Sequence, residues 1–320
     1  MQTIYSSLWA NPRRSSEVAW RRERWTTPDD DFIDVDELVP RQVSNDSLEN
    51  PPGKTGSSVL CVLFHGLEGN SQSHYARAWA AEASHRSWRL AVPHFRGCSG
   101  EINRAPRAYH SGDFEEIGWI LSRMRQRHRG PLLAVGVSLG GNALMRWAQE
   151  MGGSAAQVAN AVVSVCSPLD LTVSGHAIGR GFNRLVYTRM FLSSMKPRAL
   201  AKLAQYPGLF DREALLRARD LYAFDNVFTA PLHGFKNTDD YWEQASSASH
   251  FQRVQLPTLL INALNDPFVP AHSLPRQEDV SSWVSFWRPP QGGHVGFAQG
   301  PFPGHVCGLP SAIAGWFEAL

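Results

Sequence analysis

Short apolar runs alternate with amphipathic stretches through the middle of the chain, which predicts strands and helices in turn. The runs at 59–64, 132–137 and 161–165 are continuous and of strand length. Residues 113–127 repeat apolar side chains at i, i+3, i+4 and i+7, as a helix does. Because strands apolar on both faces need helices on both sides, we expect an α/β fold with a mostly parallel central sheet. The same reading gives further strands at 88–92, 258–263 and 283–287, and helices at 74–86, 141–151 and 311–319.

Two regions depart from this alternation. Residues 21–27 and 32–38 are strand-like and flank Pro28-Asp29-Asp30-Asp31, which predicts a β-hairpin, and the polar stretch 43–58 is expected to be a loop. A long, largely helical stretch follows the strand at 161–165 and is too long for one crossover. We therefore divide the chain into three parts. Residues 1–57 form an N-terminal segment with a hairpin that joins the sheet, residues 58–170 and 252–320 form the α/β core, and residues 171–251 form a helical cap insertion.

Composition and charge are ordinary for a soluble globular protein. Of 320 residues, 43% are hydrophobic and 19% charged, and the net charge of +2 gives no reason to expect a nucleic-acid partner. The four cysteines show no CxxC pair or zinc spacing and no HExxH motif occurs, so neither a metal nor another cofactor is expected. No window reaches the roughly 18 apolar residues of a membrane span, and a cytoplasmic location is the expectation.

The pentapeptide Gly136-Val137-Ser138-Leu139-Gly140 matches G-x-S-x-G. It follows the strand at 132–137 and leads into a helix, the setting of a nucleophile elbow. In such an elbow the serine occupies a strained turn, so its neighbours two positions away must be nearly free of side chain. Ser138 is therefore the candidate nucleophile.

A serine nucleophile needs a base and an orienting acid, which follow it along the chain in this fold. Of twelve histidines, His294 is favoured because it lies in a glycine-rich loop after the last strand, with His305 as the alternative. Asp266 ends the strand at 258–263 and is favoured as the acid. Asp170, after the strand at 161–165, competes for that role.

The oxyanion hole is predicted from His65-Gly66-Leu67-Glu68-Gly69, which follows the strand at 59–64. Backbone N–H groups just after such a turn and just after the nucleophile supply two donors in this fold. These donors are expected to be Leu67 and Leu139, with a structural role for His65.

These motifs, with Pro93-His94-Phe95-Arg96-Gly97-Cys98-Ser99-Gly100-Glu101 and Tyr109-His110-Ser111-Gly112, resemble the YheT-like, EMB8-type branch of the α/β-hydrolases. The resemblance covers the chain from about Arg21 onward. It implies carboxylesterase or lipase-type chemistry on short- to medium-chain acyl esters. Within the block we expect Arg96 to fix the loop through carbonyls or a carboxylate. A cysteine nucleophile at Cys98 is disfavoured, because the base already has a better partner in Ser138.

The stretch from Leu171 to Phe210 carries six basic residues and no acidic one, interleaved with apolar residues. The favoured interpretation is a cap whose apolar side lines an acyl pocket while its basic side faces solvent. The alternative is an amphipathic surface that contacts an anionic membrane.

The sequence thus predicts a serine carboxylesterase acting on short- to medium-chain acyl esters or lipid-like esters through an acyl-serine intermediate. Two alternatives stay open. One is an acyltransferase in which an alcohol replaces water as the acceptor. The other is an inactive binding protein on the same fold.

Overall fold

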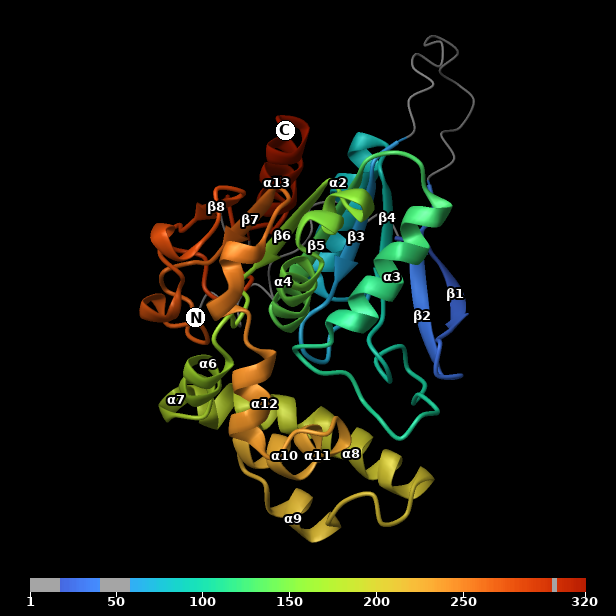
Figure 1. The fold of residues 1–320 in the computed structure, drawn as a ribbon, viewed down its shortest axis with the longest axis vertical. Helices are drawn as coiled ribbons and strands as arrows, with labels where there is room; N and C mark the ends of the chain where they lie inside the picture. Colours follow the sequence, from blue (N-terminus) through green and yellow to red (C-terminus); the bar gives the residue numbers. More distant parts are fainter. Residues whose placement is uncertain (1–17, 41–57, 301–303) are drawn as a thin grey trace.

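One eight-stranded sheet forms the centre of the computed structural model, which describes residues 18–40, 58–300 and 304–320 (Figure 1). The strand order is β1-β2-β4-β3-β5-β6-β7-β8, and every pair from β4–β3 to β7–β8 is parallel. This confirms the predicted α/β fold with a mostly parallel sheet. The strands are β1 (Trp20–Thr26), β2 (Phe32–Leu38), β3 (Leu60–Phe64), β4 (Arg89–Pro93), β5 (Leu132–Val137), β6 (Ala161–Val165), β7 (Thr258–Ile261) and β8 (Val284–Trp287).

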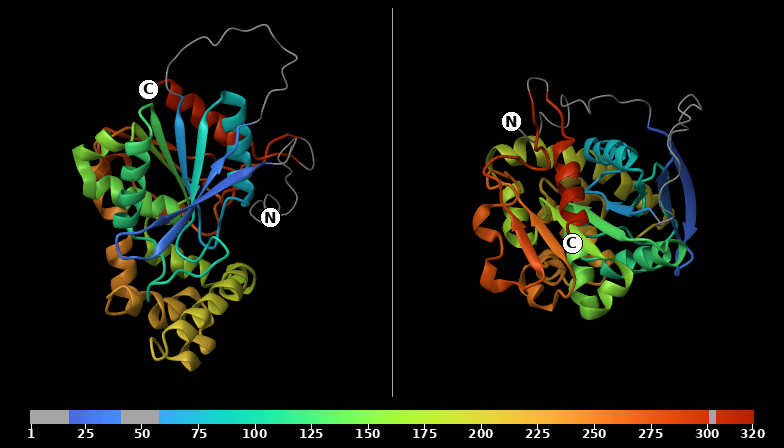
Figure 2. Two further views of the ribbon diagram at one scale, coloured as in Figure 1. Left: turned by 90° about the vertical axis from the view of Figure 1, so that its right-hand side faces the viewer. Right: turned by 90° about the horizontal axis from the view of Figure 1, so that it is seen from above.

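The first two strands form the antiparallel hairpin at one edge, and β2 pairs antiparallel with β4 (Figure 2). Two ion pairs tie β1 to buried carboxylates of β2: Arg22 Nε lies 2.7 Å from Asp36 Oδ1 and Arg24 Nε lies 2.8 Å from Asp34 Oδ1. The loop expected at 43–58 lies almost entirely outside the described residues.

Helices cover both faces of the sheet, and β3, β5, β6 and β7 are therefore buried along their whole length. On one face, α3 (Phe114–Arg127) and α4 (Leu139–Met151) pack their apolar sides onto the strands. On the other face, α2 (His74–Arg86) and the C-terminal α13 (Gly308–Glu318) do the same (Figure 2). A short helix, α5 (Ala155–Val158), precedes β6. This arrangement places the carboxyl ends of the central strands at one edge of the domain.

Between β6 and β7 the chain forms a group of helices that lies together beyond one end of the sheet (Figure 1). None of the helices within the described ranges is long and apolar enough to cross a membrane. The group consists of α6 (Leu171–Ile178), α7 (Gly181–Asn183), a π-helical turn (Arg184–Thr188), α8 (Arg189–Gln205), α9 (Arg212–Arg217), α10 (Leu221–Val227), α11 (Thr229–Leu232) and α12 (Thr238–Ala245). A 3-10 segment (Ala248–Arg253) follows and lies on the core, where Phe251 is buried in the same cluster as side chains of α4.

Candidate active site

Ser138 lies in a strained turn between β5 and α4, with φ of 53° and ψ of −119°. A Cβ at Gly136 would lie 2.5 Å from the Gly140 carbonyl oxygen, and a Cβ at Gly140 would lie 2.5 Å from the His65 carbonyl oxygen. Both distances are too short for any side chain, so the two glycines allow the strand, the helix and the neighbouring loop to approach this closely. The serine is thereby held at the carboxyl edge of the sheet.

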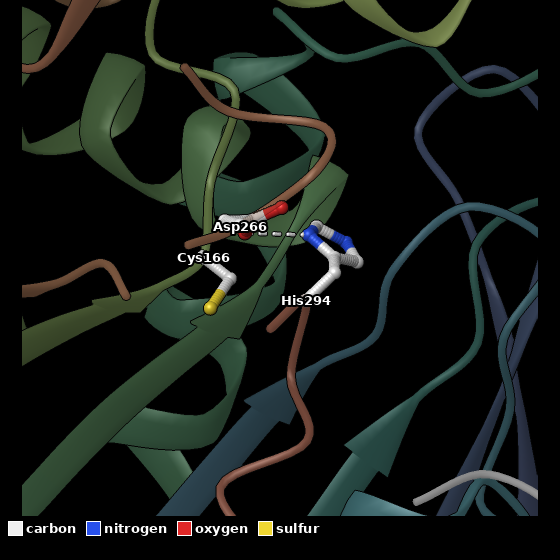
Figure 3. Close-up of side chains that lie close together, drawn as sticks. All are labelled: Cys166, Asp266 and His294. Carbon is white, nitrogen blue, oxygen red and sulfur yellow. Dashed lines mark hydrogen bonds and ion pairs between the residues drawn. The ribbon is translucent and has the colours of Figure 1, made fainter. Parts of the chain in front are cut away.

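The three residues favoured from the sequence are brought into one hydrogen-bonded chain. His294 Nε2 lies 3.0 Å from Ser138 Oγ, and His294 Nδ1 lies 2.9 Å from Asp266 Oδ2. Figure 3 shows the Asp266 carboxylate facing the imidazole ring. The second carboxylate oxygen, Oδ1, accepts hydrogen bonds from the backbone N–H groups of Phe268 and Val269, at 2.8 and 3.3 Å. The side chain of Asp266 is fully buried, so its carboxylate is held rigidly against the ring.

The competing residues have other partners. Asp170 is the N-cap of α6, and its Oδ1 accepts a hydrogen bond from the Val173 N–H at 2.9 Å. His305 pairs through its backbone with Gln299 in an isolated β-bridge. The contacts of Ser138 Oγ and Asp266 Oδ2 both go to His294, so the geometry favours the first choices.

Cys166 lies beside Asp266 and His294, and the ligand-type atoms of the three lie within 4.8 Å of one another (Figure 3). Its Sγ accepts a hydrogen bond from the Val295 N–H at 3.4 Å and lies 3.7 Å from the Gly293 carbonyl oxygen. Burial, with the nearby Asp266 charge, raises the pKa of this thiol well above its usual value. Because a metal prefers a thiolate and both His294 nitrogens contact neighbours, these residues suit proton transfer better than metal binding. Cys166 instead supports the loop that carries His294, through its contacts with Val295 and Gly293.

The loop expected to complete an oxyanion hole lies against the serine. A Cβ at Gly66 would lie 3.2 Å from Ser138 Cβ, and Leu67 and Leu139 both line the cavity that Ser138 and His294 line. Neither the Leu67 nor the Leu139 N–H donates a hydrogen bond within the described residues, so both remain available to an oxyanion.

His65 supports this loop from within the core. It is fully buried, and its Nε2 accepts a hydrogen bond from the Phe95 N–H at 3.0 Å. Burial lowers the pKa of His65 to about 3, so the ring stays neutral. The contacts fit the structural role expected for it.

A cavity of about 140 Å³ runs from Ser138 and His294 into the group of helices between β6 and β7. Its wall there is mainly apolar, with Leu171, Ile178, Phe191, Met195, Phe224 and Phe228 among the lining side chains. Other apolar side chains of the same segment face outward: Phe182 is 66% exposed, Leu185 65% and Met190 56%. This stretch therefore has an inner apolar face, as predicted, and also an outer one. The prediction that its basic residues face solvent is wrong for two of them, because Arg198 and Lys202 line the cavity and Lys202 is buried.

The block from Pro93 to Glu101 is held by charge pairing. Arg96 is buried, and its guanidinium contacts three carboxylates: Asp29 at 2.8 Å, Asp31 at 2.9 Å and Glu116 at 2.5 Å. It thus ties the hairpin loop to α3 through carboxylates and not through carbonyls. Burial raises the pKa of the Cys98 thiol to about 12, which argues against a nucleophilic role for that cysteine.

Sequence reasoning missed a polar cluster beside the candidate oxyanion hole. Glu68 Oε1 accepts hydrogen bonds from Tyr109 Oη at 2.8 Å and from Arg198 Nη1 at 3.2 Å. Arg198 comes from α8, so the contact links the helical insertion to the loop that carries Leu67. Glu68 and Tyr109 lie within the recognised motifs, but no local signal identifies a partner 130 residues away.

Comparison with known proteins agrees with this architecture. The α/β hydrolase fold family matches residues 60–301. The candidate esterase YheT of Escherichia coli is 37% identical over 320 residues, which are 99% of this chain and 89% of that protein. Mouse phospholipase ABHD3 is 25% identical over 94% of this chain and 75% of its own. The embryogenesis-associated protein EMB8 of Picea glauca is 27% identical over 94% of this chain and 65% of its own.

Solved structures show the same fold at low sequence identity. The Pyrococcus furiosus esterase PF2001 superposes with a TM-score of 0.53 and 14% identity, over 97% of this chain and 95% of its own. The family match covers most of the chain, and the bacterial relative matches it nearly from end to end. The chain therefore belongs to the α/β-hydrolase family, in its YheT-like branch.

Proposed function

We propose that this protein is a serine carboxylesterase in which Ser138 is the nucleophile, His294 the base and Asp266 the orienting acid. The chain is a carboxylic ester hydrolase by its family membership and its similarity to an esterase and a phospholipase. The observation that carries the serine mechanism is the continuous contact from Ser138 Oγ to His294 Nε2 at 3.0 Å and from His294 Nδ1 to Asp266 Oδ2 at 2.9 Å.

The geometry supports acyl transfer in two steps. Ser138 Oγ attacks the ester carbonyl carbon while its proton passes to His294 Nε2, and Asp266 holds the imidazole in the tautomer that can accept it. The carbonyl oxygen becomes an oxyanion that the Leu67 and Leu139 N–H groups stabilise. The alcohol leaves with the proton from Nε2. Water then attacks the acyl-serine by the same route and releases the acid.

The size of the cavity supports short- to medium-chain acyl groups. Its volume of about 140 Å³ is similar to that of an engineered apolar cavity of about 150 Å³ that admits benzene in another protein. Residues 171–251 would act as a cap that encloses the acyl chain, since several of its apolar side chains line the cavity.

The test is a series of p-nitrophenyl esters from acetyl to palmitoyl, assayed on the wild type, Ser138→Ala and a control, Ser84→Ala. Ser84 is an exposed serine of α2 and lies outside the cavity lining. We expect turnover to peak at a short or medium chain and to vanish only in Ser138→Ala. Turnover that survives in Ser138→Ala would exclude the serine mechanism. A profile that increases steadily to palmitoyl would exclude the chain-length preference. An added alcohol that diverts most of the acyl group into a new ester would favour the acyltransferase.

The outer face of the cap supports a peripheral contact with an anionic membrane. Exposed Phe182, Leu185 and Met190 lie among three exposed arginines, Arg180, Arg184 and Arg189. None of these arginines forms an ion pair with a carboxylate in the described part of the chain. Unpaired cations beside apolar side chains suit a surface of anionic lipid.

Co-sedimentation with vesicles tests this contact. We expect binding to vesicles that contain phosphatidylserine and weaker binding by a Phe182→Ser, Leu185→Ser double variant. Equal sedimentation with purely zwitterionic vesicles, or an unchanged double variant, would count against it. Leu216→Ser is the matched control, because it makes the same kind of change at an exposed leucine of α9 outside this face and should leave binding unchanged.

A further inference from the structure

A carboxylate of the helical insertion lines the same cavity as Ser138. Asp225 belongs to α10, and its side chain accepts two hydrogen bonds from uncharged donors: Thr229 Oγ1 at 2.6 Å to Oδ1 and Trp242 Nε1 at 2.9 Å to Oδ2. A carboxylate offers about four acceptor sites, so these donors leave acceptor capacity at a group that borders the cavity.

The cationic side chains around the cavity all have polar partners, whereas the Asp225 carboxylate interacts with no cation among the described residues. Its three cationic side chains are each engaged: Arg96 with carboxylates, Arg198 with Glu68, and Lys202 with the carbonyl oxygens of Asn103 and Ala105. Asp225 is partly buried. Burial raises the pKa of Asp225 to about 6, so the group is ionised at pH 8. A carboxylate that is withdrawn from bulk water without a cation is costly, and at a cavity wall it indicates a ligand that supplies the missing charge.

Four aromatic residues of α10, its C-cap and α12 line the same cavity as this carboxylate. Phe224 lies on α10 next to Asp225, and Phe228 is the C-cap residue of that helix. Tyr241 and Trp242 come from α12. The indole lies directly on α6, since a Cβ at Gly175 would be 2.4 Å from Trp242 Cη2. Ring faces attract cations, and a cage of aromatic rings is the usual recognition site for a quaternary ammonium group.

We propose that Asp225, with the rings of Trp242 and Phe228, binds a positively charged ammonium group in the part of the substrate that enters the cap. This inference rests on the proposed esterase function and specifies its substrate class as esters that carry a cationic group away from the reacting carbonyl. An ammonium provides the charge that the carboxylate lacks and a surface that the rings favour. A plain acyl chain provides neither.

The experiment compares two matched series of p-nitrophenyl esters at pH 8. One series has acyl chains of graded length that end in trimethylammonium, and the other ends in the neutral tert-butyl isostere. At the best chain length we expect kcat/KM of the wild type to be at least tenfold higher for the cationic ester than for the neutral one. In Asp225→Asn we expect this ratio to fall at least tenfold. Asp239→Asn removes an exposed carboxylate of α12 that is not part of the cavity wall, and it should keep the preference.

A binding measurement on the wild type does not depend on the folding of a variant. Calorimetry should show that an alkyltrimethylammonium ion binds at least tenfold more tightly than its tert-butyl analogue. A third ester that ends in a hydroxyl group controls for hydrogen bonding alone. The inference is overturned if neither comparison shows a preference for the cation, or if Asp225→Asn keeps the preference. It is also overturned if the hydroxyl-terminated ester exceeds the tert-butyl ester in kcat/KM as much as the cationic ester does. Neutral esters that are still hydrolysed through Ser138 would show that the proposed function stands while this inference fails.

Discussion

Replacing Asp266 by Asn is the change whose consequence the site geometry defines most closely. Asp266 Oδ1 accepts the Phe268 and Val269 N–H groups, while Oδ2 faces His294 Nδ1. An asparagine can keep its oxygen on the two backbone donors, which leaves its NH₂ group facing Nδ1. That group donates, so it favours the tautomer with the proton on Nε2, where no lone pair remains for the Ser138 proton.

The fold should therefore persist while the chemistry fails. We expect kcat in Asp266→Asn to fall on the order of 10⁴-fold, as when the same change is made in a known triad. That factor corresponds to about 5 kcal/mol of lost transition-state stabilisation. Steady-state hydrolysis of a p-nitrophenyl ester gives kcat, and thermal unfolding should show little change in Tm.

Asp170→Asn is the matched control, because it makes the same chemical change at the competing aspartate. Asp170 caps α6 through one hydrogen bond to the Val173 N–H, and asparagine caps about as well as aspartate. We expect activity within about twofold of the wild type. A collapse of kcat in Asp170→Asn with near-normal turnover in Asp266→Asn would refute the assignment of the acid.

Two further predictions concern the support of the site. Gly141→Ala would place a Cβ 1.9 Å from Ser167 Oγ, so we expect a loss of roughly 2 kcal/mol or more in unfolding free energy. Gly315→Ala is the control, because there is open space around that position and the change should not destabilise α13. Equal Tm values for the two variants would contradict this. His65 is buried with its pKa lowered to about 3 from 6.5, so protonation favours the unfolded chain and the stabilisation it gives is lost as pH falls below 6.5. The unfolding free energy of the wild type relative to His65→Gln should thus fall by about 1 kcal/mol between pH 7 and 5.5 in urea titrations, and a constant difference would show that the ring titrates normally.

Much of the fold could be predicted from the sequence because its strands are unusually explicit. Strands buried on both faces must be apolar throughout, so β3, β5 and β6 appear as continuous runs within one residue of their observed bounds. The nucleophile was equally readable, since the close approach at Gly136 and Gly140 permits no other residue type. Helix bounds were less certain: α4 begins at Leu139, directly after Ser138, and not at Gly141.

Choosing between Asp170 and Asp266 needed information that no local pattern holds. Both follow a buried strand, and only the sheet order places β7 beside β8 and so brings Asp266 to the loop that carries His294. The contact of Arg198 with Glu68 and the position of Asp225 on the cavity wall depend on how the insertion folds back onto the core. Short amphipathic helices do not determine that packing by their sequence alone.

Labelling with a fluorophosphonate probe tests the central claim most directly, because the probe reacts with a serine only when a base activates it. Mass spectrometry of the labelled wild type should locate the adduct on the peptide that contains Ser138, and Ser138→Ala should take up no probe while Ser84→Ala labels normally. An adduct on any other residue, or labelling that persists in Ser138→Ala, would contradict the account.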